Sequence, residues 1–120
     1  MDISPLSSAL SGMSAHATKL AVAANNIANI NTDQFKKSTA TIESNISGQP
    51  ETKITQSTTP GAILVNSEGL PEGETIRELS NVDIAEELVQ MKVAEYGYKA
   101  NIGVIRTQDE MIGTILDIIA

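Results

Sequence analysis

The sequence predicts a mainly α protein in which two long terminal helices pair as an antiparallel, coiled-coil-like hairpin around a short irregular or β-hairpin middle segment. Near both ends of the chain, apolar residues recur at alternating intervals of four and three, the spacing of a helix-packing seam. The residues between these two stretches are rich in Ser, Thr, Asn and Gln. Aromatic residues make up only 2% of the 120 residues, so a core would rely on aliphatic side chains, which suits seams between helices.

Composition excludes several classes of function. The formal net charge is −7, which makes nucleic acid and anionic membrane surfaces poor partners. Cysteine is absent, which excludes disulfides and thiolate chemistry. No apolar run approaches the roughly 20 residues that span a bilayer, so we expect no membrane insertion. Residues 1–12 lack a basic segment followed by an apolar one, so we also expect no cleavable secretory signal.

The first helix is predicted over residues 5–31, within an N-terminal region of residues 1–37. Ser4 suits the N-cap and Pro5 the first helical position. Two alanines in the periodic stripe, Ala17 and Ala24, would let a neighbouring helix approach closely. The stripe consists of Leu6, Leu10, Met13, Ala17, Leu20, Ala24 and Ile27.

The stretch "ANNIANINTDQFKK", residues 24–37, places a cluster of amides at the end of this helix. A calcium loop of the EF-hand type fails, because Gln34 stands where the sharp turn needs Gly and Ala40 stands where the bidentate Glu belongs. Two explanations of the amide cluster remain. In the first, the amides end the helix, with Asn29 or Asn31 in the left-handed conformation. In the second, they form an interface, because a buried amide fixes the register of packed helices.

Four asparagines are more than a helix stop needs, and this favours the interface. We expect Asn25, Asn26 and Asn29 to specify contacts between copies and to add little to the stability of the isolated chain.

The middle region, residues 38–79, contains a candidate β-hairpin. Two segments of β-type residues, 52–57 and 62–66, flank the turn signal Pro60-Gly61. The sequence "SEGLPEGE", residues 67–74, is typical of a loop.

The C-terminal region, residues 80–120, is predicted to form a helix of about 55 Å at ~1.5 Å per residue. Ser80 with Asp83, or Asp83 with Glu86, fits a capping box at its start, and Glu95 with Lys99 fits a favourable i,i+4 pair. Gly97, Gly103 and Gly113 are each expected to cost roughly 1 kcal/mol relative to Ala. The periodic positions are Ile84, Leu88, Met91, Glu95, Tyr98, Ile102, Ile105, Asp109, Ile112, Leu116 and Ile119.

The apolar stripes of both helices must be shielded from water, and the long connection lets the chain turn back. We therefore expect the two helices to pack against each other. The only histidine, His16, lies beside the first stripe without catalytic companions, and no Gly-rich phosphate loop is present. We therefore expect no catalytic residue, metal or cofactor. The residues predicted to pair the helices and to form the assembly interface are Leu6, Leu10, Met13, Leu20, Asn25, Asn26, Ile27, Asn29, Leu88, Met91, Tyr98, Ile102, Ile105 and Ile112.

Two long segments resemble the terminal signatures of the bacterial flagellar axial proteins, the rod and hook components. The N-terminal one is "SALSGMSAHATKLAVAANNIANINTDQFKK", and the C-terminal one is "SNVDIAEELVQMKVAEYGYKANIGVIRTQDEMIGTILDII". "ANNIAN" and "SNVDIAEELV" are the most specific parts. The family commonly has Gly before the aromatic residue that follows "NT", where this chain has Gln34.

The resemblance implies terminal helices that pair as coiled coils in the inner wall of a tube, and a middle segment that contacts neighbouring subunits. It implies export through the flagellar type III apparatus, assembly with copies of the chain and with other axial proteins, and a place in the rod of the basal body. The short middle segment suits the small proximal rod components, whereas "SNVDIAEELV" is closer to the sequences of hook and distal rod proteins. The alternative function is a soluble helical-hairpin adaptor or export-linked binding module related to axial proteins.

Overall fold

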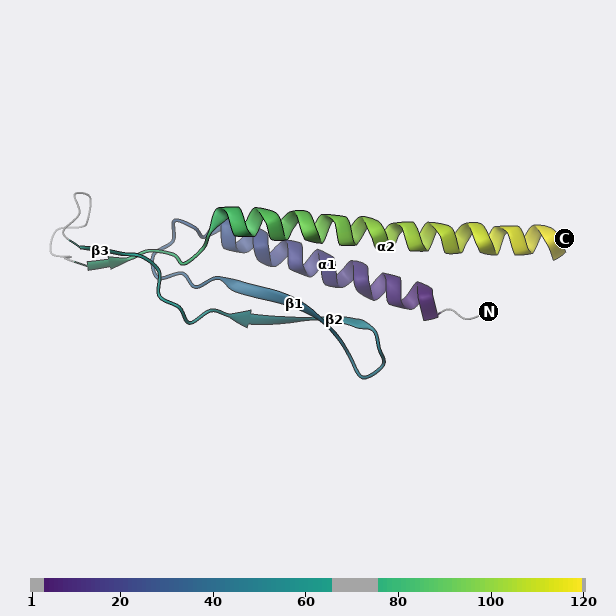
Figure 1. The fold of residues 1–120 in the computed structure, drawn as a ribbon, viewed down its shortest axis with the longest axis horizontal. Helices are drawn as coiled ribbons and strands as arrows, with labels where there is room; N and C mark the ends of the chain where they lie inside the picture. Colours follow the sequence, from purple (N-terminus) through teal and green to yellow (C-terminus); the bar gives the residue numbers. More distant parts are fainter. Residues whose placement is uncertain (1–3, 66–75, 120) are drawn as a thin grey trace.

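The computed structural model describes residues 4–65 and 76–119. Its elements are α1 (Ser4–Ala28), β1 (Ser38–Ser44), β2 (Pro50–Gln56), β3 (Ile63–Val65), β4 (Ile76–Glu78) and α2 (Ile84–Ile119). The molecule is elongated, with extents of 79 × 26 × 17 Å. In Figure 1 the two helices lie side by side and run in opposite directions, with β1 and β2 along the side of α1 that faces away from α2. The predicted mainly α fold with a small β middle is confirmed.

Helix α1 ends at Ala28, earlier than predicted, and Asn29, which follows it, closes its last turn. The N–H of Asn29 donates to the carbonyl oxygens of Asn25 (3.2 Å) and Asn26 (3.1 Å). Its side-chain amide also donates to the Asn25 carbonyl oxygen at 3.0 Å. The left-handed residue after the helix is not an asparagine, however. Among the described non-glycine residues it is Gln34, with a φ of 58°.

The backbone of Gln34 is left-handed at the position where the resemblance would predict a glycine. A left-handed conformation costs an L-residue roughly 1–2 kcal/mol, and glycine adopts it freely. The N–H of Gln34 nevertheless donates to the carbonyl oxygen of Glu78 at 3.0 Å. The turn therefore forms despite the side chain, and contacts with a distant segment hold it in place.

Of the two predicted starts of helix α2, the structure has the second, with Asp83 as the N-cap. One carboxylate oxygen of Asp83 accepts from the backbone N–H of Ala85 at 2.8 Å and from that of Glu86 at 3.3 Å, which satisfies two of the orphan donors of the first turn. The Glu86 side chain pairs with Lys37 (Nζ–Oε2 2.6 Å). Helix α2 is longer than α1 and extends past its start (Figure 1).

The predicted pairing of 52–57 with 62–66 is wrong. Strand β2 pairs with β1 in an antiparallel register from Ser38↔Gln56 to Ser44↔Pro50, and β3 pairs with β4. The β1–β2 turn is closed by Asn45, whose side-chain oxygen accepts from the N–H groups of Ser47 (2.9 Å) and Gln49 (3.0 Å). Gly48 supplies the positive φ of 76° that this turn needs.

Pro60-Gly61 has a different role from the predicted hairpin turn. A Cβ on Gly61 would lie 2.0 Å from the carbonyl oxygen of Leu79, so glycine is needed for close backbone approach. The N–H of Leu79 donates to the carbonyl oxygen of Ala62 at 2.8 Å. The predicted loop 67–74 lies outside the described residues.

Small side chains form the seam between α1 and α2. A Cβ on Gly97 would lie 2.2 Å from the ring of His16, and one on Gly12 would lie 2.9 Å from the Asn101 amide. Ala94 is 1% exposed. Burial, and to a lesser extent the charge of Lys19, hold the pKa of His16 below its usual range, so the ring in the seam is neutral at pH 7.

This seam runs one residue before each predicted stripe. On α1 it contains the buried residues Ala9, Gly12 and Ala23, and on α2 it contains the buried residues Glu87 and Ala94. Large apolar residues therefore flank the seam instead of forming it.

Asn26 corrects the expectation that the asparagines add little to the isolated chain. Asn26 is only 1% exposed. Its amide donates to the carbonyl oxygen of Ser38 at 2.7 Å and accepts from the Ser38 N–H at 3.0 Å. This two-point contact ties α1 to the start of β1. Asn25, in contrast, is exposed.

We predict that Asn26→Ala lowers the free energy of unfolding by about 2 kcal/mol, because it leaves the backbone N–H and the carbonyl oxygen of Ser38 without their partner. Urea denaturation followed by circular dichroism measures the change. Asn25→Ala is the matched control and should lie within about 0.5 kcal/mol of the wild type. Equal effects of the two substitutions would contradict the internal role of Asn26.

We predict that Gln34→Gly raises the free energy of unfolding by about 0.5–1 kcal/mol. Relief of the left-handed strain exceeds the added entropy of glycine in the unfolded chain. Gln34→Ala keeps the Cβ and should give no gain in the same urea titration. A gain with alanine as large as that with glycine would show that the side chain, and not the backbone, carries the cost.

Candidate functional site

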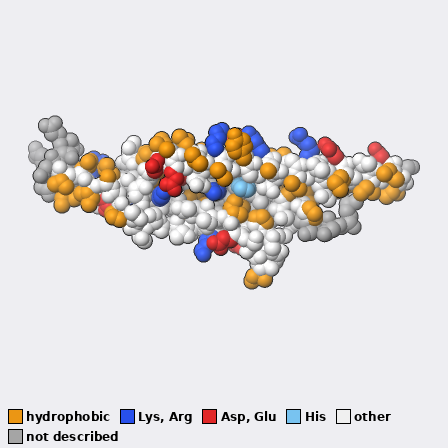
Figure 2. All heavy atoms as spheres, in the orientation of Figure 1, with side chains coloured by type: hydrophobic (Ala, Val, Ile, Leu, Met, Phe, Trp, Pro, Cys, Tyr) orange, Lys and Arg blue, Asp and Glu red, His pale blue; other side chains and the backbone are white. Residues whose placement is uncertain are grey.

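The face of the helix pair that carries the large apolar residues is open. Leu10 is 61% exposed and Leu88 is 51% exposed. Figure 2 shows apolar side chains gathered along the helices on this face, with His16 among them. A monomer rarely leaves such an extended apolar surface uncovered, and surfaces of this kind mark interaction sites.

A groove with a volume of about 700 Å³ lies between the two helices on this face, and Leu20, Leu88, Met91 and Tyr98 are among its lining residues. A second hollow of about 420 Å³ is lined by Leu6, Ile102, Ile105 and Ile112 together with polar residues.

Charged residues of α2 border the larger groove. Glu95 accepts from Lys99 (Nζ–Oε1 2.6 Å) and from Lys92 (Nζ–Oε2 2.9 Å). The hydrogen bonds from Lys99 and Lys92 lower the pKa of Glu95 to about 2. The three residues carry one net positive charge at pH 7, which gives this edge of an acidic protein a basic character.

The end of α2 that extends past α1 is also apolar on its surface. Met111, Leu116, Ile118 and Ile119 are between 55% and 78% exposed. Figure 2 shows apolar side chains at this tip of the molecule. The open face therefore continues from the groove to the end of the described helix.

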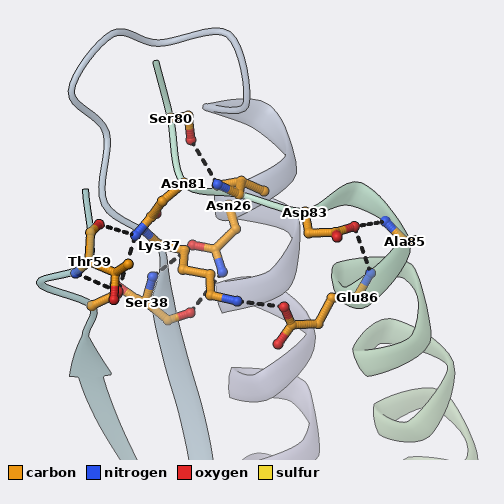
Figure 3. A network of polar contacts seen from close by, with 11 residues as sticks. Asn26, Lys37, Ser38, Thr59, Ser80, Asn81, Asp83, Ala85 and Glu86 are labelled. Atoms are coloured by element: carbon orange, nitrogen blue, oxygen red, sulfur yellow. Dashed lines mark hydrogen bonds and ion pairs between the residues drawn. The ribbon is translucent and has the colours of Figure 1, made fainter. Parts of the chain in front are cut away.

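A network of polar contacts fixes the opposite end of the helix pair (Figure 3). The side chain of Asn81 accepts from the N–H of Lys37 at 2.7 Å and donates to Ser57 Oγ at 3.1 Å and to the Thr59 carbonyl oxygen at 2.8 Å. The N–H of Asn81 donates to the Phe35 carbonyl oxygen at 3.3 Å. One amide side chain thus joins the exit of α1, the end of β2 and the entry of α2.

Ion pairs reinforce this network, which we call the strap (residues 33–37 with 77–81). Arg77 contacts Asp33 (Nε–Oδ2 2.6 Å), and Lys36 contacts Glu78. The hydrogen bonds from Lys36 and from the Gly61 N–H hold the pKa of Glu78 below its usual range. Partly exposed pairs contribute little free energy each, so the strap acts mainly by fixing where the two helices meet.

The predicted site residues fall into three groups. Exposed residues are Leu10, Leu20, Asn25, Leu88, Tyr98 and Ile102; half-buried residues are Leu6, Met13, Ile27, Asn29, Met91, Ile105 and Ile112; and Asn26 is buried. The hollows bring eight of them together from the two helices. The sequence reasoning missed the strap, because neither Lys37 nor Asn81 lies in a periodic stripe. It also missed the fit of His16 onto Gly97, for which the glycine was the available signal.

Within residues 4–65 and 76–119, no three His, Cys, Asp or Glu side chains gather as a metal site would need. No described helix is long and apolar enough to cross a membrane. The arrangement offers an apolar docking surface carried on a rigid helix pair.

Comparisons with known proteins point to one family. The family model "Flagella basal body rod protein" matches residues 6–36, and "Flagellar basal body rod FlgEFG protein C-terminal" matches residues 76–118. Together the matches cover more than half of the chain. They cover nearly all of both helices and all of the strap except Lys37.

Similar curated proteins include "Flagellar hook protein FlgE" of Escherichia coli (strain K12) and the proteins of the same name from Salmonella typhimurium and Salmonella typhi. Each is 44% identical over 41 residues, which is 34% of this chain and 10% of the hook protein. The aligned part thus spans about a tenth of the length of these relatives. With two rod-family models matched in order at its two helical segments, the chain belongs to the family of flagellar rod and hook proteins.

Proposed function

We propose that the chain is a structural subunit of the flagellar basal-body rod that polymerises through its terminal helices into the tubular drive shaft. Membership of the family supports an axial structural role, and both matched models describe rod proteins. The observation that carries the proposal is the open apolar face. It is built by the matched helices, and nothing within the described chain covers it.

The geometry of the face supports growth into a filament. The groove and the exposed end of α2 lie at different places on an elongated molecule, so neighbours would be joined through unlike surfaces. Contacts between unlike surfaces generate open helical assemblies when the rotation does not close. The strap supports the same role, because it fixes the two helices as one rigid element.

A rod position is favoured over a hook position by the middle segment. The residues between the two matched segments, 37–75, contribute the ribbon of β1 and β2 and the short strand β3 in their described part, and β3 pairs with β4 at the start of the second matched segment. Each hook protein is about ten times as long as the segment of it that aligns. A short middle suits a proximal rod component, whose partners would be copies of itself and other axial proteins.

The remaining parts of the proposal follow from the family. The subunit would leave the cytoplasm through the type III export apparatus and would act in the periplasmic part of the basal body. It needs no cofactor and performs no enzymatic reaction. An adaptor function would instead require one defined partner on the open face.

We predict that Leu10→Asp with Leu116→Asp weakens self-association at least tenfold. Both leucines are 61% exposed, so the charges cost the folded chain little but are unfavourable in an apolar contact. Sedimentation velocity from micromolar to millimolar concentrations measures the assembly, and circular dichroism checks that the helices persist.

Ile63→Asp is the matched control, because Ile63 is 59% exposed on β3, away from the helices. It should assemble like the wild type. A wild-type chain that stays monomeric up to millimolar concentration would contradict the proposed function, and a stable one-to-one complex with a different protein would favour the adaptor.

A further inference from the structure

The tip of the β1–β2 hairpin holds an apolar side chain in solvent. Ile46 is fully exposed, and it lies in a turn that is well ordered by its own hydrogen bonds. The N–H of Asn45 donates to the Gln49 carbonyl oxygen at 2.9 Å, and that of Gly48 donates to the Asn45 carbonyl oxygen at 2.9 Å. Figure 2 shows an apolar side chain at the end of the projection below the helices. A turn fixed in this way presents Ile46 at little entropic cost on binding.

The strands behind this tip carry an unfavourable pair of charges. Glu43 lies directly opposite Glu51 in the register of the hairpin, and like charges in such positions are destabilising. Lys53 reaches Glu43 only at 4.0 Å. Ala40 is buried, and because side chains alternate along a strand, Glu43 faces away from α1. The two carboxylates are therefore free to meet cations on another molecule.

The groove on the helix pair has the complementary properties. Its volume of about 700 Å³ lies within the range of pockets that enclose a small ligand, so it has room for the turn with its isoleucine. Lys92 and Lys99 stand along the groove, with side chains 67% and 63% exposed. In helical rise they are roughly 10 Å apart, and their long side chains can converge on two carboxylates whose Cβ atoms lie about 5 Å apart across the hairpin.

The hairpin cannot reach the groove of its own chain. Strands β1 and β2 are fixed along α1 by Thr52, whose hydroxyl donates to the Ala15 carbonyl oxygen at 3.3 Å, and by Gln49, whose amide donates to Ser7 Oγ at 2.8 Å. In Figure 1 they lie on the opposite side of α1 from α2. The hairpin tip can therefore contact the groove only when the two belong to different molecules.

We propose that the Ile46 tip of one copy inserts into the Leu20–Leu88–Met91–Tyr98 groove of a second copy, with Glu43 and Glu51 facing Lys92 and Lys99. The inference rests on the proposed function and names the partner of one part of the open face. The exposed end of α2 stays available for helix packing between subunits. Because tip and groove differ, the contact repeats from copy to copy without closing.

The first test is Ile46→Ser, compared with Ile54→Ser on the same hairpin, where Ile54 is 55% exposed. Losing a buried isoleucine should raise the dissociation constant of self-association about tenfold or more in sedimentation velocity. The Ile54 variant should match the wild type. Equal behaviour of both variants overturns the proposal.

The second test reverses the charges. Glu43→Lys with Glu51→Lys in one chain, and Lys92→Glu with Lys99→Glu in another, should each weaken self-association, because tip and groove then carry the same sign. An equimolar mixture of the two chains restores both contacts and should assemble like the wild type. A mixture as weak as its components overturns the proposal.

These outcomes separate the inference from the function on which it rests. If the Ile46 and charge variants assemble normally while Leu10→Asp with Leu116→Asp does not, the tip contact is wrong and the helical assembly stands. If the wild type fails to assemble at all, the proposed function itself fails.

Discussion

The close approach of His16 to Gly97 determines most of what is distinctive in this molecule. The imidazole occupies the space that a Cβ at position 97 would need, so the two helices meet through their smallest residues. The Nδ1 atom of His16 is buried without a partner in the described chain, a cost of about 1–3 kcal/mol that the packing must offset. This seam directs the large aliphatic side chains to its flanks, where they form the groove and the rest of the open apolar face. An internal seam of leucines would have left little for a neighbour to bind.

The strap fixes the helix pair at one end, in addition to the seam along its length. Lys37 contacts both Asn81 and Glu86, so the exit of α1 and the first turn of α2 are held to one position. Asn26 adds the start of β1 to the same end through Ser38. The helices are therefore joined firmly at one end, while α2 extends alone at the other (Figure 1). In the proposed axial assembly, this arrangement would give each subunit a rigid base and a long apolar helix end for its neighbours.

The sequence predicted the two helices, the Asp83 cap and the Glu95–Lys99 pair because these depend on local spacing. It misplaced both seams by one residue, since periodicity marks an apolar stripe without telling whether the same chain or another copy covers it. The small residues Gly12, Ala94 and Gly97 were the available signal for close approach. The hairpin partner was missed because the prediction relied on Pro60-Gly61 as the turn and did not consider the Asn45–Gly48 turn. The bond between Asn26 and Ser38 is a long-range contact that no local pattern reveals.

The free energies of unfolding of Gly97→Ala and Gly103→Ala test the central claim about the seam most directly. Both residues lie in α2, where alanine is favoured over glycine by roughly 1 kcal/mol. A Cβ at position 103 meets nothing within 4 Å, whereas one at position 97 meets the His16 ring. Urea denaturation should therefore show Gly103→Ala to be more stable than the wild type by about 0.5–1 kcal/mol and Gly97→Ala to be less stable by at least about 1 kcal/mol. A similar gain in both variants would contradict the account, because it would mean that the helices do not meet at Gly97.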